Sequence, residues 1–477
     1  MRLEQLHIQN YRCFSDLRIQ FHPKLTVLIA PNGSGKTTIL DAARVALWPY
    51  VKGFDLGSQT GKGASIQLND VRLVRQDSGN MEPQVPSVIS ATGSILSGDK
   101  GMTWVQTRER MKPGTNTLVD SATKVITALG KKMEAHVRTP EGNGPLTLPL
   151  VTYLGTSRLW YEGRFTSEAE DIALDDSAYS RTSGYLNCLS YSSSFKAFKV
   201  WYAWVYRSYR ENQIEALEKN SDLSEVGHRF AAAIQVVKSA VDALVRSATG
   251  WHSLEYSSSY NQNLVMSHDT LGVMPVDMLS DGLRNAIAMV ADLAFRAYKL
   301  NPHLGAEAAW QTPGVALIDE VDMFLHPSWQ QTILQSLQTA FPRLQFIVST
   351  HSPQVLTSVD AACIRKLVPY TNADTGVKTV SIEDIHFQTR GVASVDVMAR
   401  IMGVDPVPDV LEARQLADYH GFIQKNLHES SEAQTLREVL NTHFGPDHPV
   451  MQECDRLIRL QAFKQRLPVQ RATVGQG

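Results

Sequence analysis

The sequence predicts an α/β protein with a parallel-sheet core, and three observations support that prediction. The run from Leu25 to Ala30 is almost wholly apolar and leads into a Gly-rich loop and a helical stretch. A second apolar strand, 314–319, ends in two acids, and a third, 345–350, is followed by a histidine. Strands that are apolar throughout are typical of parallel sheets covered by helices on both faces. We therefore expect a mixed N-terminal β lobe, this core, a helical insert and a helical C-terminal tail.

Length and composition narrow the class of protein. A chain of 477 residues allows about three domains. Lysine and arginine (46) nearly balance aspartate and glutamate (48), so any contact with nucleic acid would rest on a local patch. The four cysteines are scattered without a CxxC pair, which favours a reducing compartment. Because no run of about 18 apolar residues occurs, we expect no membrane span and a cytoplasmic protein.

The pattern along the chain divides it into four parts. Residues 1–95 alternate as strands do and contain the first apolar strand. Residues 96–270 form an insert that is mixed at first and helical from Phe195 onward. Residues 271–390 carry the second strand-rich block, and residues 391–477 are a helical tail. The apolar positions of the tail suit packing against a partner, another copy or the sheet itself, and the sequence leaves these alternatives open.

The strongest motif is the loop between the first apolar strand and its helix, residues 30–38, which we name the phosphate loop. Its two glycines let consecutive backbone N–H groups turn inward, and the following helix aims its N-terminus at an anion. Lys36 would reach the β- and γ-phosphates, and the Thr37 hydroxyl would ligate Mg²⁺. The motif usually opens with glycine, where this chain has Ala30. The residues expected to bind nucleotide are Asn32, Gly33, Ser34, Gly35, Lys36, Thr37 and Thr38.

Two strand ends supply candidate catalytic residues. Asp319 would support Mg²⁺ together with Thr37, and Glu320 would orient and deprotonate an attacking water. His351 follows the strand 345–350 and could form a hydrogen bond with a γ-phosphate. Each has an ordinary alternative when taken alone, namely a solvated strand end or a satisfied loop histidine. In a chain that also contains the phosphate loop, the two acids are a strong indication of a nucleotide-hydrolysing site.

A second helix start completes the set. Ser280 and Gly282 open a helix whose first N–H groups could face an anion. By itself this pattern is a plain helix cap. Because it lies in the same strand-rich block as Asp319, we expect this helix start to belong to the same site.

These segments, in this order, resemble the ABC-type ATPase head shared by SMC-like and RecF-like proteins of the AAA family. In that family, ATP lies between the phosphate loop of one head and the signature helix of another. The resemblance implies ATP and Mg²⁺ as cofactors and a homo-oligomer built from head-to-head dimers. It further implies that Glu320 is the base, that His351 is a switch histidine, and that Ser280 and Gly282 act on the partner's γ-phosphate.

The resemblance has two departures. Asp281 stands where the signature usually has glycine, and the glutamine that contacts Mg²⁺ cannot be placed, Gln67 and Gln76 being weak candidates. Asp322 would belong to the loop that follows the acids. His326 and the proline after it resemble a feature of the RecF-like and OLD-like branches.

The rest of the chain resembles PtuA, the ATPase subunit of Septu-type antiphage systems, including those associated with retrons. The segments that carry this likeness are 154–160, 184–188, 390–404 and the stretch from Phe444 onward. The likeness implies a partner HNH nuclease, PtuB, whose activity the ATPase controls. It also allows contact with nucleic acid through the complex.

Other members of the wider family remain as alternatives. An SMC-like protein needs a long coiled coil, and the insert shows no heptad seam. A RecF-like DNA repair ATPase should present a basic surface, whereas only dispersed basic residues are evident, such as Arg72, Arg75, Lys131 and Lys132. An ATP-driven oligomer scaffold is a third hypothesis, which substitution of Glu320 would separate from a true hydrolase.

We expect no nuclease activity in this chain. OLD-type relatives carry a Toprim nuclease after the ATPase, which needs a glutamate early in a strand and a later DxD pair. The sequence offers Glu383, Asp384 and Asp405 but no DxD at a strand end. His443 and His448 flank a Gly-Pro turn and resemble a metal cluster only loosely.

Overall fold

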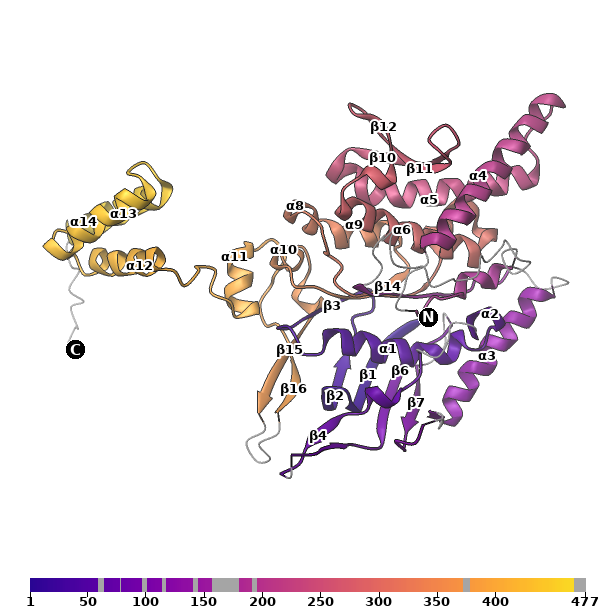
Figure 1. The fold of residues 1–477 in the computed structure, drawn as a ribbon, viewed down its shortest axis with the longest axis horizontal. Helices are drawn as coiled ribbons and strands as arrows, with labels where there is room; N and C mark the ends of the chain where they lie inside the picture. Colours follow the sequence, from indigo (N-terminus) through magenta and orange to yellow (C-terminus); the bar gives the residue numbers. More distant parts are fainter. Residues whose placement is uncertain are drawn as a thin grey trace, which may run out of the picture. The chain divides into compact units, whose positions relative to one another are not determined.

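The computed structural model describes residues 1–58, 64–77, 79–96, 101–113, 117–139, 145–156, 180–190, 195–371 and 378–466. The chain divides into two compact units, Met1–Met402 and Gly403–Gly477, which we name unit 1 and unit 2 (Figure 1). Each unit has a hydrophobic core of its own.

A six-stranded sheet runs through unit 1 in the order β16-β15-β3-β14-β13-β9. Its centre consists of β3 (Leu25–Ile29), β14 (Leu344–Ser349) and β13 (Gly314–Ile318), which pair in parallel. All three strands are buried along their whole length, as the continuous apolar runs predict. The predicted α/β class with a parallel core is confirmed.

The flanks of this sheet come from distant parts of the chain. β15 (Ile364–Thr371) pairs in parallel with β3, and β16 (Lys378–Glu383) adds an antiparallel edge. β9 (Leu150–Leu154) pairs in parallel with β13. β9 thus lies in the core sheet although the sequence division places it within the insert 96–270. A buried five-residue strand pairs with partners far along the chain, so local periodicity does not show which sheet it joins.

A five-stranded antiparallel sheet forms the N-terminal lobe, in the order β2-β1-β6-β7-β8. Buried and half-buried residues alternate along β6, as expected for a sheet with one face on the core. The strands are β1 (Arg2–Tyr11), β2 (Phe14–Gln20), β6 (Ser87–Ser94), β7 (Met102–Arg108) and β8 (Leu118–Val119), beside the separate pair β4 (Leu73–Arg75) and β5 (Met81–Pro83). β7 and β8 extend this lobe past the expected boundary at residue 95.

The helix α1 (Lys36–Val51) lies between the two sheets and contacts both (Figure 1). Pro49 in its last turn has no N–H, so the carbonyl of Val45 lacks its usual helical donor. The buried side chain of Gln106 supplies a replacement, with Nε2 donating to Val45 O at 2.6 Å. The helix therefore continues through the proline with its backbone satisfied.

One buried amide ties the two sheets of unit 1 together. Gln345 on β14 accepts from Leu3 N at 2.8 Å and donates back to Leu3 O at 2.7 Å, with a further bond to His22 O. Because the side chain is 2% exposed, these bonds satisfy an amide that would otherwise be costly to bury.

Helices cover the other face of the core sheet (Figure 1). α4 begins at Phe195, where the helical part of the insert is expected, and a small antiparallel sheet, β10-β11-β12, follows α5. These elements are α4 (Phe195–Glu218), α5 (Glu225–Thr249), β10 (Trp251–Ser257), β11 (Asn263–His268), β12 (Gly272–Pro275), α6 (Asp281–Leu300) and α9 (Ile333–Ala340). The other helices of unit 1 are α2 (Asp55–Ser58), α3 (Ser121–Arg138), α7 (Ala308–Gln311), α8 (Pro327–Gln330), α10 (Pro353–Leu356), α11 (Ser394–Val397) and the π-helix Met398–Met402.

The segment 184–188, one of those that resemble PtuA, is a packing element of unit 1. The fully buried Tyr185 donates its hydroxyl to Pro149 O at 2.7 Å and lies 3.2 Å from the Tyr50 hydroxyl. It thereby joins β9 to α1. Residues 157–160 of the other segment lie outside the described residues.

Unit 2 consists of α12 (Leu411–Gln424), α13 (Ser431–Phe444) and α14 (Pro449–Arg466), which confirms the helical tail. Its core includes Tyr419, Ile423 and Leu440. Among the described residues of both units, no helix has the length and apolar character needed to cross a membrane.

Candidate nucleotide site

The phosphate loop joins the buried strand β3 to α1. Gly33 has φ 78° and Gly35 φ 98°, left-handed conformations that favour glycine. No atom lies within 4 Å of the place where a Cβ on Gly33 would stand, so the loop is open there. A Cβ on Gly35 would lie 2.4 Å from the Phe14 ring and 2.8 Å from Cys13 Sγ. The turn between β1 and β2 therefore packs directly on the loop and requires the second glycine.

The polar residues of the phosphate loop differ in exposure. Asn32 and Thr37 are exposed, whereas Ser34, Lys36 and Thr38 are buried. Lys36 donates from Nζ to Ala30 O at 3.0 Å, across the mouth of its own loop. Burial lowers the pKa of Lys36, and the nearby carboxylates of the acid pair act in the opposite direction.

The first acid of the pair meets the phosphate loop directly. Thr37 donates its hydroxyl to Asp319 Oδ2 at 2.9 Å, although the two residues lie 282 positions apart. Asp319 is 3% exposed at the end of β13, and its other oxygen accepts from the Ser349 hydroxyl. A hydroxyl and a carboxylate side by side are hard oxygen donors of the kind that Mg²⁺ prefers.

The second acid is held by its backbone. Glu320 has φ 46°, a left-handed conformation that is uncommon for a residue with a side chain. Its N–H donates to Ser349 Oγ at 2.8 Å, so the end of β14 fixes both acids. Ser349 was not singled out by the sequence. Its only signal there was its position just before Thr350 and the candidate histidine.

His351 lies among the charges of this site. Burial lowers its pKa, the charge of Lys36 lowers it further, and Glu320, Asp322 and Asp319 oppose these effects. Thr350, the residue before it, donates to Asp322 Oδ1 at 2.5 Å. The carboxyl ends of neighbouring parallel strands thus bring the phosphate loop, the two acids and the histidine to one edge of the sheet.

The predicted signature helix contacts a different part of the chain. Ser280 is exposed and caps α6, its hydroxyl accepting from Leu283 N at 3.4 Å. A Cβ on Gly282 would lie 2.3 Å from Phe324 O, and Asn285 Nδ2 donates to Met323 O at 3.1 Å. Neither Ser280 nor Gly282 forms a described hydrogen bond with the phosphate loop of its own chain.

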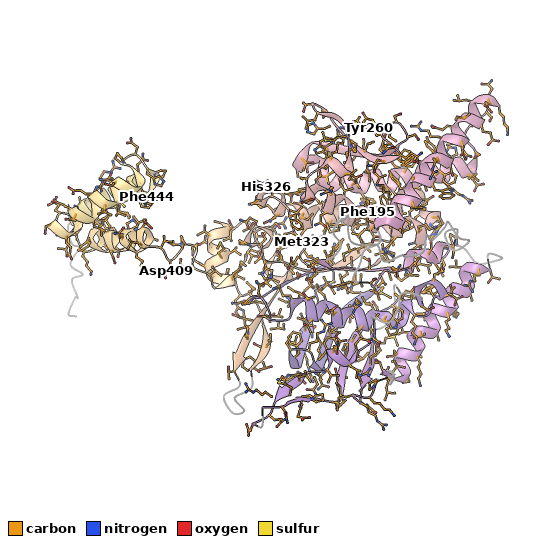
Figure 2. The ribbon with its side chains drawn as sticks, in the orientation of Figure 1. Phe195, Tyr260, Met323, His326, Asp409 and Phe444 are labelled. Carbon is orange, nitrogen blue, oxygen red and sulfur yellow. The ribbon has the colours of Figure 1, made fainter. Side chains whose placement is uncertain are left out.

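The loop that α6 contacts is the one that follows Glu320. Met323 and His326 of this loop are labelled in Figure 2. The His326 ring caps α8 and accepts from Ser328 N at 3.3 Å. The start of α6 and Glu320 are therefore linked through one short segment.

The weak glutamine candidates lie elsewhere. Gln67 donates to Ser65 in the N-terminal lobe, and Gln76 precedes a turn closed by its N–H bond to Asn80 O at 2.8 Å. The residues of the site itself fit a nucleoside triphosphate with Mg²⁺, because an open left-handed glycine, a lysine and an oxygen donor pair converge there.

Comparison with known proteins agrees with this geometry. An AAA domain model matches residues 5–229, and an AAA domain model associated with the AbiEii toxin of a type IV toxin–antitoxin system matches 154–357. The retron Ec83 probable ATPase of Escherichia coli is 24% identical over 95% of this chain and 86% of its own length. The Septu protein PtuA of Bacillus thuringiensis is 23% identical over 44% of this chain and 51% of its own length.

Two further matches are to proteins of other kinds, a nuclease and a solved Smc head. An OLD nuclease of Thermus scotoductus is 23% identical over 74% of this chain and 59% of its own length. A solved Smc head, bound to the C-terminal winged-helix domain of ScpA, aligns with 81% of this chain and 98% of its own at 14% identity and a TM-score of 0.46. In sequence, the chain resembles ATPases of the AAA type, and in particular the ATPases of retron and Septu systems.

Proposed function

We propose that this chain is the Mg²⁺-dependent ATPase subunit of a bacterial antiphage assembly and that it controls a partner HNH nuclease in the cytoplasm. The observation that carries the proposal is the similarity to a retron probable ATPase over 95% of the chain, together with the convergence of Thr37, Asp319 and Glu320 at one sheet edge. A repair ATPase of the RecF kind is the competing function.

The side chains have separable roles in this proposal. Lys36 holds the β- and γ-phosphates, while Thr37 and Asp319 hold the metal, which supplies charge neutralisation at the phosphates. Glu320 orients water and accepts its proton from a position fixed by Ser349. His351, whose pKa is lowered, stays neutral near pH 7 and can donate a hydrogen bond to the terminal phosphate.

A second copy of the chain completes the site. Ser280 is exposed at the tip of α6, where its side chain and the first N–H groups of the helix can face a triphosphate held by another copy. We therefore propose a head-to-head dimer in which Ser280 and Gly282 act across the interface. The backbone of Gly282 also packs against the loop that follows Glu320. Closure of the dimer at Gly282 would therefore affect the position of the catalytic acid.

Glu320→Gln tests the hydrolytic role. The variant should bind ATP normally, lose turnover by about 100-fold or more, and accumulate as an ATP-bound dimer, because only proton acceptance is removed. Glu383→Gln is the matched control, since Glu383 pairs with Lys366 at 3.1 Å at the far edge of the sheet. Phosphate release, ATP binding and light scattering measure the three effects. Equal turnover in both variants would contradict the role of Glu320.

The partner is tested by purifying the chain with the product of its neighbouring gene. We expect an HNH nuclease whose cleavage of plasmid DNA depends on ATP, with a dependence that Glu320→Gln changes. Cleavage at the same rate with and without ATP would contradict the proposed regulation of the nuclease by this chain. ATPase activity that DNA stimulates, with salt-sensitive DNA binding and no nuclease partner, would instead favour the repair function.

We also propose that the isolated chain does not cut DNA. The ion pair with Lys366 accounts for Glu383, and the described residues after it, 384–466, contain no strand on which a Toprim sheet could be built. His443 meets the Phe444 ring edge-on at 4.6 Å between ring centroids, and His448 lies 5.2 Å from the same ring, so contacts with Phe444 account for their proximity. No group of three potential metal ligands occurs within the part of the chain that the structure describes.

A further inference from the structure

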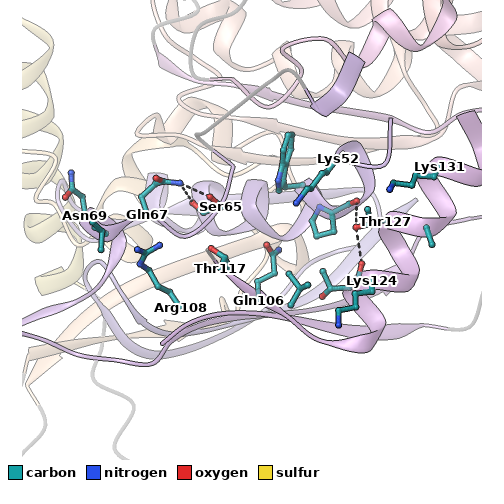
Figure 3. Close-up of a pocket in the computed structure, with 16 residues that line it drawn as sticks. Lys52, Ser65, Gln67, Asn69, Gln106, Arg108, Thr117, Lys124, Thr127 and Lys131 are labelled. Atoms are coloured by element: carbon teal, nitrogen blue, oxygen red, sulfur yellow. Dashed lines mark hydrogen bonds between the residues drawn. The ribbon is translucent and has the colours of Figure 1, made fainter. Parts of the chain in front are cut away.

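A large basic cavity lies in the N-terminal lobe of unit 1 (Figure 3). Its volume is about 1270 Å³, which exceeds the roughly 300–1,000 Å³ of ordinary small-ligand pockets and leaves room for a nucleotide with its water. Trp48, Pro49 and Lys52, from the end of α1 and just beyond it, line one side. The phosphate loop lies at the opposite end of the same helix, so this cavity is a separate place from the ATP site.

The charges that line the cavity are all positive. Lys52, Lys124, Lys131 and Arg108 contribute, and no aspartate or glutamate is among the described lining residues. The three lysines are exposed, and none forms an ion pair with a described acid. Lysines gathered where the described lining holds no acid raise the local potential and favour an anionic ligand. In the sequence, Lys131 appeared only as one of several dispersed basic residues.

The packing of α1 against α3 gathers the lysines at one end. A Cβ on Gly53 would lie 2.8 Å from Gly130 Cα, so the two backbones touch. Lys52 and Lys131, the chain neighbours of these glycines, are brought to the same end by this contact. Lys124 lies two helical turns earlier, about 10 Å along α3. That spread suits a chain of phosphates better than a single ion.

The opposite end is richer in neutral hydrogen-bonding groups. Figure 3 shows Arg108, Gln67 and Asn69 together, away from the labelled lysines. Arg108 is 5% exposed and donates to Ile66 O at 3.1 Å, which ties the end of β7 to the segment that carries both amides. The Gln67 amide is held at this end by its bonds to Ser65. The exposed amide of Asn69 can donate and accept at once, so it can recognise the edge of a nucleobase.

We propose that this cavity binds a nucleotide carrying two or more phosphates, with the phosphates at the lysine end and the base toward Gln67 and Asn69. The ligand is distinct from the ATP at the phosphate loop. Because it would contact the last turn of the helix whose first turn holds Lys36, the site is placed to influence ATP use. The proposal stands independently of the defence function.

The test uses full-length protein with Lys36→Ala, which disables the phosphate loop. Calorimetric titration with ATP, GTP and inorganic tripolyphosphate should reveal a remaining site that prefers a nucleotide to tripolyphosphate. Adding Lys124→Glu and Lys131→Glu should weaken nucleotide binding by about tenfold or more. Lys132→Glu is the matched control, since it lies on the same helix outside the cavity lining and should change affinity less than about twofold.

Thermal melting of each variant confirms that it folds, and Lys124→Gln with Lys131→Gln replaces the charge reversals if they do not. Absence of nucleotide binding in the Lys36→Ala protein would overturn the proposal, as would equal weakening by Lys132→Glu. If tripolyphosphate binds as tightly as the nucleotides, the base makes no contribution to binding, and the proposal of a nucleotide ligand is wrong. If the cavity binds a ten-residue oligothymidylate but neither ATP nor GTP, the ligand is single-stranded DNA and the nucleotide proposal is wrong.

Discussion

His351 shows how single side chains tune the proposed ATP site. Burial is the largest cause of its lowered pKa, followed by the charge of Lys36. The folded protein therefore binds this proton less readily than the unfolded chain does, so protonating conditions favour unfolding. The stability that depends on a neutral His351 is complete above about pH 6.5 and is lost as the pH falls below that value.

We predict that His351→Gln flattens this dependence. Between about pH 7.5 and about pH 5.5, the melting temperature of the wild type should fall more than that of the variant. Differential scanning calorimetry across this range measures the difference. His386→Gln removes an exposed loop histidine and should follow the wild type. Parallel curves for the wild type and His351→Gln would contradict the assignment.

Motifs in the sequence were enough to predict most residues of the candidate site. The sequence pointed to Lys36, Thr37, Asp319 and His351, and the structure brings them to one sheet edge. It gave no means to see that Ser349 holds both acids, because that role depends on strand order. The close approach of Gly282 to the loop after Glu320 was hidden for the same reason.

Among the elements, α1 connects the phosphate loop, the two sheets of unit 1 and the basic cavity. It begins at the phosphate loop, lies between two sheets and ends beside the basic cavity. The sequence predicted a helix after the phosphate loop, but it did not show how the helix passes Pro49. The helix continues to Val51 because Gln106, on a strand of the other sheet, satisfies the carbonyl that the proline leaves free.

We predict that Gln106→Ala destabilises the protein by about 1–3 kcal/mol, because Val45 O would remain buried without a donor. Gln76→Ala, at an exposed position on a turn, should change stability by less than about 0.5 kcal/mol. Urea denaturation followed by tryptophan fluorescence compares the two. If the variants prove equally stable, the side chain of Gln106 does not support the helix.

Strand pairing was the least predictable property of the elements. The apolar runs of β3, β13 and β14 are long and flanked by clear motifs, so their class was evident. β9 is equally buried but carries no adjacent motif, and it joins β13 across about two fifths of unit 1's sequence. Such non-local contacts leave no periodic trace in a single sequence.

For the whole molecule, the separate cores of the two units make a truncation informative. A chain that ends at Met402 should keep ATP binding and melt within about 2 °C of unit 1 in the full protein, since the core of unit 2 contains none of its residues. A chain that ends at Ala393 also loses Val397 and Ile401, which are fully buried in the core of unit 1.

The shorter chain should melt about 4 °C lower or more. Scanning calorimetry with ATP titration distinguishes the two truncations. A large loss of stability or of ATP binding on ending at Met402 would show that unit 2 supports the fold of unit 1.

The central claim is that the phosphate loop of this chain hydrolyses ATP, and steady-state phosphate release tests it most directly. Lys36→Ala should lower the rate by about 100-fold or more, because the buried cation at the phosphates is removed. Lys24→Ala, an exposed lysine before β3, should stay within about twofold of the wild type. Hydrolysis by Lys36→Ala at the wild-type rate would contradict the account.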